Sequence, residues 1–188
     1  MKLSQALLSI FVASAAAYTP DAPSTRREMF KSVVATGVAS AFVASPSIAN
    51  ALESCPKGSK NCILTTWSPP SGTSKDDSIA SLRKVLESYP QEGQDKVDLG
   101  GWTIVEDNFS SGSARIEYKS GIGNFAKFFN GGKPFTDDLK IQIAESGNFE
   151  VRSSSRVGDS DLGVNQKRLS FLGAKLRAAG WGIPEPTY

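Results

Sequence analysis

The chain has 188 residues, contains no histidine and carries a formal net charge of +2. This length suits one domain preceded by a processed leader. Beyond residue 51 the basic and acidic side chains balance at 17 each, so this part lacks the positive surface on which nucleic-acid binding depends. The composition therefore argues against a nucleic-acid partner, and the absence of histidine excludes Ser-His-Asp and Cys-His catalysis.

Residues 1–17 have the pattern of a secretory signal peptide. Lys2 is followed by a mostly apolar run over residues 6–12 and then by small residues at 14–17, which match the three regions of such a peptide. The apolar run is too short to span a membrane.

Residues 18–51 predict a second targeting signal. Arg26 and Arg27 precede a mildly apolar run over residues 33–44, and an Ala-x-Ala cleavage pattern follows at 49–51, as in a twin-arginine signal. The alternative is an uncleaved membrane anchor over residues 33–44, which is short for that role.

Two stacked signals resemble the presequences of thylakoid-lumen proteins in algae whose plastids have extra envelope membranes. The resemblance implies a plastid protein of the thylakoid lumen, with a mature globular domain at residues 52–188. In its mature form we expect no stable transmembrane segment.

The two cysteines, Cys55 and Cys62, lie near the start of the mature domain. In an oxidising compartment this spacing predicts a disulfide that ties down the N-terminal segment. A redox switch is the alternative. Two cysteines without histidine are too few for a structural zinc site, and we expect neither a metal nor another cofactor.

The first predicted helix of the mature domain is amphipathic. Ser74 is placed to cap it, apolar residues recur at helical spacing from Ile79 to Tyr89, and Pro90 ends it. A second helix is expected over residues 164–179, and the tail after it is expected to be extended.

Between the helices the sequence predicts four strands. Apolar and polar residues alternate over 102–106, 114–119, 135–144 and 149–153. Half-polar strands with short turns favour an antiparallel sheet with one covered face. The expected fold is therefore α+β, a single domain in which an antiparallel sheet of about four strands packs against two helices.

A glycine-bounded segment between the second and third predicted strands contains Phe125, Phe128 and Phe129. Three phenylalanines there could insert into a membrane, a pigment or a partner. The alternative is a short helix that caps the core.

The segment from Phe149 to Leu169 organises the chain, because it places many charges and hydroxyls between a strand and a helix. Its long motif from Arg152 to Arg168, together with Asn61-Cys62 and Phe135-x-Asp137-Asp138, resembles the domain of unknown function 1499 family. The similarity extends from Asn61 to about residue 177. Since this family has no established activity, the resemblance implies no substrate.

The aspartates of this motif cannot act together. Asp137 and Asp138 are neighbours on a strand and must point to opposite faces, so only one can join a buried pair with Arg152 or Arg156. For the same reason the two carboxyl groups cannot converge as a catalytic pair.

Two further motif residues flank the last helix. Asp161 is placed to accept hydrogen bonds from its first N–H groups, and Asn165 to bond backbone carbonyls of the turn. One interpretation is a structural salt-bridge hub. The other is that Arg152, Arg156 and Asn165 bind an anionic ligand or a partner's carboxylate.

These observations favour a non-catalytic accessory protein of the thylakoid lumen that associates with a photosystem or antenna complex in the membrane. The alternative is a carrier for a lipid, a pigment or another small ligand, for which Phe125, Phe128 and Phe129 would stand at the mouth of an apolar cavity. An enzyme is the third possibility, although nothing in the sequence singles out a catalytic group.

Overall fold

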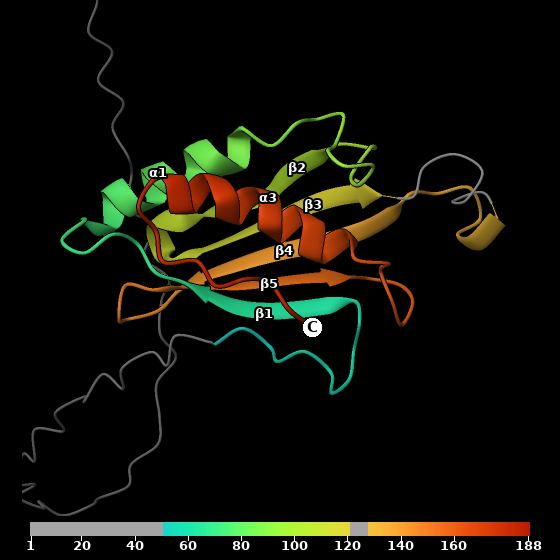
Figure 1. Ribbon diagram of the computed structural model, residues 1–188, viewed down its shortest axis with the longest axis horizontal. Coiled ribbons are helices and arrows are strands. Elements are labelled where there is room, and N and C mark those ends of the chain that lie inside the picture. Colours follow the sequence, from blue (N-terminus) through green and yellow to red (C-terminus); the bar gives the residue numbers. More distant parts are fainter. Residues whose placement is uncertain (1–50, 121–127) are drawn as a thin grey trace, which may run out of the picture. The chain divides into compact units, whose positions relative to one another are not determined.

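The computed structural model describes residues 51–120 and 128–188, and these form a five-stranded antiparallel sheet with two α-helices on one face (Figure 1). The strands lie in the order β1-β5-β4-β3-β2. Their bounds are β1 (Cys62–Trp67), β2 (Trp102–Asn108), β3 (Ser113–Ser120), β4 (Phe135–Ile143) and β5 (Phe149–Ser155). The helices are α1 (Lys75–Glu87), α3 (Val164–Ala178) and a short 3-10 helix, η1 (Phe109–Ser111).

The predicted α+β class, the antiparallel sheet and the two helices are confirmed, but the expected strand count was too low. β1 is the additional strand, and it pairs antiparallel with β5 at the edge of the sheet. The sequence Cys-Ile-Leu-Thr-Thr-Trp does not alternate cleanly, because Cys62 and Ile63 are both buried. Periodicity alone therefore misses it.

The core lies between the helices and the sheet. The strands contribute alternate residues to it, among them Ile116 and Leu139, and the helices contribute Leu82, Leu86 and Leu172; all five are fully buried. At about 25 cal/mol per Å² of buried apolar surface, this layer supplies the main driving force for folding.

Helix α1 begins and ends where its local chemistry requires. The Ser74 side chain accepts a hydrogen bond from the Asp77 N–H at 3.1 Å, and Pro90 follows the C-cap at Ser88. A capped start and a proline after the end fix both limits of the helix.

The C-terminal tail returns across the domain. Trp181 is buried against Phe149, with ring centroids 5.2 Å apart, and Gly182 exchanges backbone hydrogen bonds with Ser68. The tail is thus extended and packed on the core.

No helix within the described ranges is both long and apolar enough to cross a membrane. The two predicted targeting signals, residues 1–17 and nearly all of 18–51, lie outside the described residues, as does Phe125.

Candidate functional site

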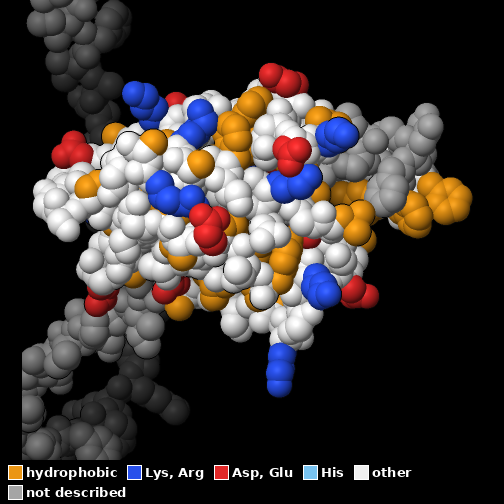
Figure 2. All heavy atoms as spheres, viewed as in Figure 1, with side chains coloured by type: hydrophobic (Ala, Val, Ile, Leu, Met, Phe, Trp, Pro, Cys, Tyr) orange, Lys and Arg blue, Asp and Glu red, His pale blue; other side chains and the backbone are white. Residues whose placement is uncertain are grey.

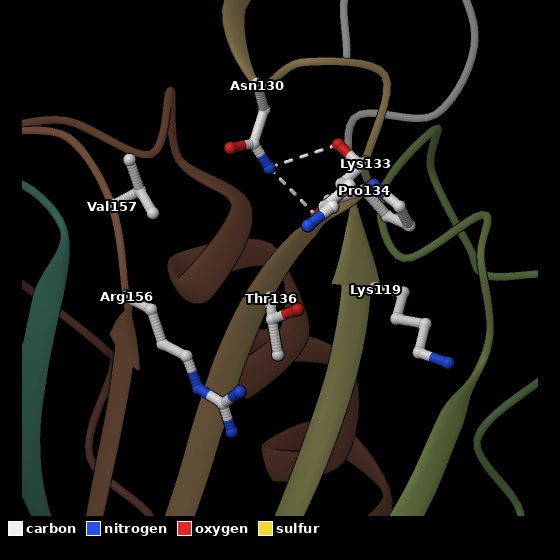
Figure 3. A pocket seen from close by; sticks show the side chains of 7 residues that line it. All are labelled: Lys119, Asn130, Lys133, Pro134, Thr136, Arg156 and Val157. Carbon is white, nitrogen blue, oxygen red and sulfur yellow. Dashed lines mark hydrogen bonds between the residues drawn. The ribbon is translucent and has the colours of Figure 1, made fainter. Parts of the chain in front are cut away.

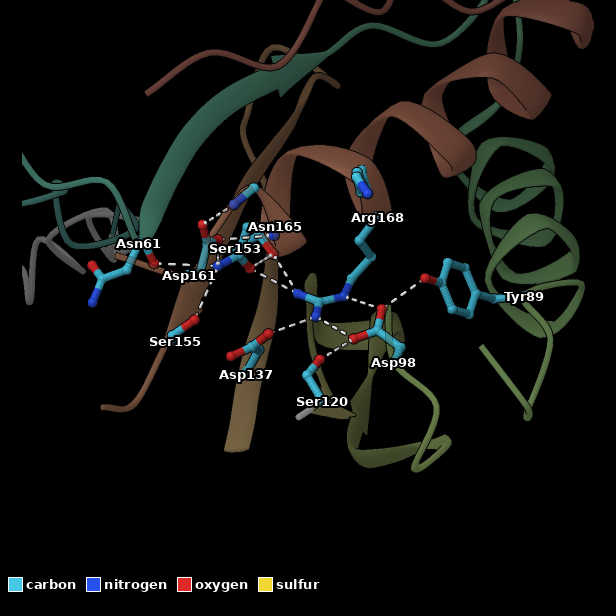
Figure 4. Close-up of polar contacts among 12 residues, drawn as sticks. Asn61, Tyr89, Asp98, Ser120, Asp137, Ser153, Ser155, Asp161, Asn165 and Arg168 are labelled. Carbon is cyan, nitrogen blue, oxygen red and sulfur yellow. Dashed lines mark hydrogen bonds and ion pairs between the residues drawn. The ribbon is translucent and has the colours of Figure 1, made fainter. Parts of the chain in front are cut away.

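A buried guanidinium stands at the centre of the polar residues of the long motif (Figure 4). Arg168 on α3 and Asp98 in the loop before β2 are both 0% exposed. Arg168 Nε donates to Asp98 Oδ2 at 2.7 Å, and Nη2 donates to Asp98 Oδ1 at 2.5 Å. This is the bidentate geometry in which arginine recognises a carboxylate best.

The same guanidinium reaches the middle of the sheet. Nη2 also donates to Asp137 Oδ2 on β4 at 2.6 Å, while Nη1 donates to Asn165 Oδ1 at 2.7 Å and to Ser153 Oγ at 3.2 Å. Arg168 therefore ties α3 to β4, β5 and the loop before β2 at once.

Two hydroxyls complete the shell of Asp98. Tyr89 donates to Oδ2 at 2.7 Å and Ser120 donates to Oδ1 at 2.6 Å. Each carboxylate oxygen of Asp98 thus accepts one bond from a hydroxyl and one from Arg168, as a buried charge requires.

The loop that delivers Asp98 is held in an unusual conformation. Asp98 has φ 55°, and the turn before it is closed by backbone hydrogen bonds between Gln94 and Val97. A Cβ at Gly93 would stand 2.1 Å from the Val97 carbonyl oxygen. Only glycine permits this close approach.

The surroundings of Arg168, Tyr89 and Tyr118 raise the pKa values of these three groups. Burial by itself would lower the pKa of Arg168, but its bonds to Asp98 and Asp137 raise it above the usual range. Burial raises the pKa of Tyr89 and of Tyr118, whose ring lies 4.4 Å from the Arg168 guanidinium. At neutral pH the arginine is charged and both phenols are protonated.

A second chain of bonds joins the cluster to the start of α3. Asp161 Oδ2 accepts from the Asn165 backbone N–H at 2.9 Å and from Asn165 Nδ2 at 2.5 Å, and its Oδ1 accepts from the Gly163 N–H at 2.9 Å. The N-cap residue is Gly163, which offers no side chain, so Asp161 serves the free N–H groups from two residues earlier. Asn165 Nδ2 also donates to Asn61 O at 3.3 Å.

Asp137 and Asp138 point to opposite faces of the sheet. Asp137 faces the helices and its partner is Arg168, not Arg152 or Arg156 as the sequence suggested. Asp138 lies on the outer face, where Arg156 Nε donates to its Oδ2 at 2.8 Å and Arg115 Nη1 to its Oδ1 at 3.1 Å. Burial opposes ionisation of Asp138, but these two arginines hold its pKa below the usual value.

The predicted anion-binding set of Arg152, Arg156 and Asn165 does not come together. Asn165 is fully buried on the helix side, whereas Arg156 pairs with Asp138 and Glu117 on the outer face. Arg152 donates to Ser154 Oγ at 2.8 Å and lies directly opposite Lys140. The three residues therefore cannot contact one ligand.

A shallow depression of about 400 Å³ opens at the end of the sheet beside Arg156 (Figure 3). Lys119, Lys133 and Arg156 line it, and none of its lining residues is acidic. The remaining lining residues are Asn130, Pro134, Thr136 and Val157. Arg156 is already paired with Asp138 and Glu117, so Lys119, Lys133 and the Thr136 hydroxyl are the groups with which the depression could bind an anion.

The two phenylalanines of the glycine-bounded segment that can be described do not cap the core. Phe128 is 83% exposed and Phe129 61%, and their rings contact each other with centroids 4.9 Å apart. Both residues are helical, as the alternative interpretation expected, but their side chains do not cap the core.

Cys55 and Cys62 form the predicted disulfide, with Cα atoms 5.6 Å apart. It anchors the segment before β1. Within residues 51–120 and 128–188, no group of three or more Cys, Asp or Glu side chains could hold a metal ion.

Arg168 was not among the residues predicted for the hub, although its position in the sequence carries a signal. Arg168 lies on the same helical stripe as Asn165, Leu169, Leu172 and Leu176, all buried. A charged residue inside an apolar stripe must find a buried partner.

Residues 44–176 match the family model described as "Protein of unknown function (DUF1499)". No curated protein matches the chain.

Proposed function

The chain belongs to the DUF1499 family, and from this premise we propose that it is a non-catalytic accessory protein of the thylakoid lumen that associates with a photosystem or antenna complex. This proposal is supported by the buried polar side chains of the motif and by the two targeting signals predicted at residues 1–51.

The closed network around Arg168 carries the proposal. The polar side chains of the motif that point inward are buried and bond to one another: Arg168 and Asn165 are 0% exposed and Asp137 is 1% exposed, and Arg168 donates to both of the others. A substrate cannot reach groups placed in this way. The network stabilises the fold, and recognition is left to the outer surface.

Affinity purification of the tagged protein from mildly solubilised thylakoids tests the proposal. We expect recovery of a defined photosystem or antenna assembly, and comigration with that assembly on native electrophoresis. Migration of the protein by itself under mild detergent would contradict the proposal.

A matched pair of variants makes this test specific. R156Q alters the outer face beside the depression, while R83Q removes an exposed ion pair with Asp107 on the edge strand β2. Loss of the assembly with R156Q and retention with R83Q would support association through the end of the sheet.

A carrier for a lipid or pigment is the alternative. It requires an apolar cavity between sheet and helices, where Leu82, Ile116 and Leu139 are 0% exposed and pack in one cluster. Recovery of the protein by itself with a bound lipid or pigment, identified by mass spectrometry, would favour the carrier.

A further inference from the structure

The four most exposed large apolar side chains of the described residues lie in two segments. Phe128 is 83% exposed, Leu162 77%, Phe129 61% and Val157 51%. Phe128 and Phe129 are helical residues of the connection that leads into β4, and Val157 and Leu162 lie in the loop that follows β5. Because β4 and β5 are antiparallel, with Asp137 opposite Ser155, both segments adjoin the same end of the sheet.

This end of the sheet forms an apolar protrusion. Figure 2 shows hydrophobic side chains that project from the right-hand end of the molecule, where Figure 1 places the segment beginning at residue 128. Phe128 and Phe129 meet edge to face. Leu162 has φ 56° and points into solvent, a conformation that is strained for a bulky residue and that clusters at binding surfaces.

Two lysines lie at the same end of the sheet. Lys119 and Lys133 line the depression beside Val157, and neither has an ion pair with the rest of the described chain. Thr136 stands opposite Lys119 in the register of β3 and β4 and adds a hydroxyl to the lining. The depression therefore offers positive charge and a hydroxyl beside Val157, at the end of the sheet that leads to the exposed phenylalanines.

We propose that this end of the sheet binds the surface of a lipid bilayer that contains anionic lipids. Phe128, Phe129 and Leu162 enter the boundary between headgroups and acyl chains, and Lys119 and Lys133 bind the headgroup phosphate in the depression. The inference concerns the lipid surface and stands independently of any protein complex.

The residue types favour a lipid surface over a protein partner. Phe128 and Phe129 lie shortly before Lys133 in the chain, and aromatic side chains close to lysine are typical of segments that lie in the membrane interface. Lysine is depleted in the core of protein–protein interfaces, whereas each lysine near an anionic bilayer adds to the attraction.

Vesicle binding by the full chain tests the charge requirement. We expect K119Q/K133Q to lower partition onto vesicles of phosphatidylcholine mixed with phosphatidylglycerol about tenfold or more. The matched control is K75Q/K84Q, which removes two exposed lysines from α1 and leaves the end of the sheet unchanged. All variants keep the same residues 1–51, so the differences report the sheet end alone.

Insertion is measured locally with F128W. The native Trp67 and Trp181 are buried and Trp102 is partly buried, so an added exposed indole supplies the quenchable signal. We expect bromine atoms in the acyl chains of the anionic vesicles to quench F128W, and the quenching to fall when K119Q/K133Q is added.

Three results would overturn the proposal. They are the absence of quenching, quenching unaffected by K119Q/K133Q, and equal quenching on vesicles of phosphatidylcholine alone. The proposal would also be overturned if the full chain bound no vesicles but stayed bound to purified membrane complexes, because the partner would then be a protein.

Discussion

Arg168 and Asp98 are seventy residues apart in the chain, yet they form a bidentate ion pair in which both side chains are fully buried. Asp98 comes from a loop outside the regular elements, and Arg168 from the first half of the last helix. The pair therefore fixes the position of a loop and a helix relative to the sheet. Its specificity comes from the fork geometry of the guanidinium, which lysine cannot reproduce.

Replacement of Arg168 should strongly destabilise the fold. We expect R168M to lower the free energy of unfolding by about 3 to 5 kcal/mol, because Asp98 and Asp137 are then left buried without their cation. Urea unfolding measures the loss. R83M is the control, since Arg83 makes the same bidentate contact with Asp107 but with both side chains at least 33% exposed. It should cost at most about 1 kcal/mol, and equal losses would contradict the role given to burial.

Replacement of the buried Asp137 should likewise destabilise the fold more than replacement of its neighbour Asp138. D137A removes a buried acceptor from Arg168 and should cost about 2 to 3 kcal/mol. D138A leaves Arg156 with Glu117 and with solvent, and should cost about 1 kcal/mol or less. The measurement is again urea unfolding; a larger loss for D138A would mean that the faces of β4 are reversed.

Much of this site follows from local rules. The alternation along β4 predicts that Asp137 and Asp138 face opposite ways, and the position of Asp161 before α3 predicts its bonds to the first N–H groups. Asp98 could not be predicted, since it lies in a polar loop and reaches the core only through positive φ angles at Asp95, Lys96 and itself. That conformation depends on tertiary contacts which no spacing reveals.

The edge strand β1 could not be predicted from its sequence either. β1 is short and its burial pattern is irregular, because Cys62, which forms the disulfide, is buried next to Ile63. Its place beside β5 is set by long-range pairing. Propensity within six residues is too weak to establish such a strand.

Alkaline pH should destabilise the fold through two tyrosines. Burial is the main cause that raises the pKa of Tyr89 and Tyr118 above the ordinary value of 10.0. Their contribution to stability is complete below about pH 10 and is lost as the pH rises, because the unfolded chain then releases protons that the folded state retains. Each should cost up to about 1.4 kcal/mol per pH unit above that point.

Tyr118 offers a sharper version of this test. Its hydroxyl is buried without a hydrogen-bond partner in the described residues, so Y118F should be neutral or stabilising by about 1 kcal/mol at neutral pH. It should also reduce the loss of stability per pH unit in alkali, because one of the two titrating groups is removed. Urea unfolding between neutral and alkaline pH, with tyrosinate absorbance recorded in parallel, measures both effects; a strongly destabilised Y118F would show that the hydroxyl has a partner.

Mild acid should leave the fold intact. The chain has no histidine to titrate near neutrality. The carboxyl groups of Asp138 and Asp107 have pKa values held below 3.8 by arginine partners, in Asp138 against the opposing effect of burial. A depressed folded pKa gives stability that is present above the unfolded value and is lost as the pH falls through the folded value. The urea midpoint should therefore stay level down to about pH 5 and decline below about pH 4.

The variant D107N/D138N provides the control for the acid limb. It lacks both depressed carboxyl groups, so it should start less stable at neutral pH and show a shallower decline in acid. Circular dichroism during urea unfolding at each pH measures the two curves. A cooperative loss of structure between about pH 5 and pH 6 would contradict this account, since it would require a carboxyl group whose pKa the fold raises instead.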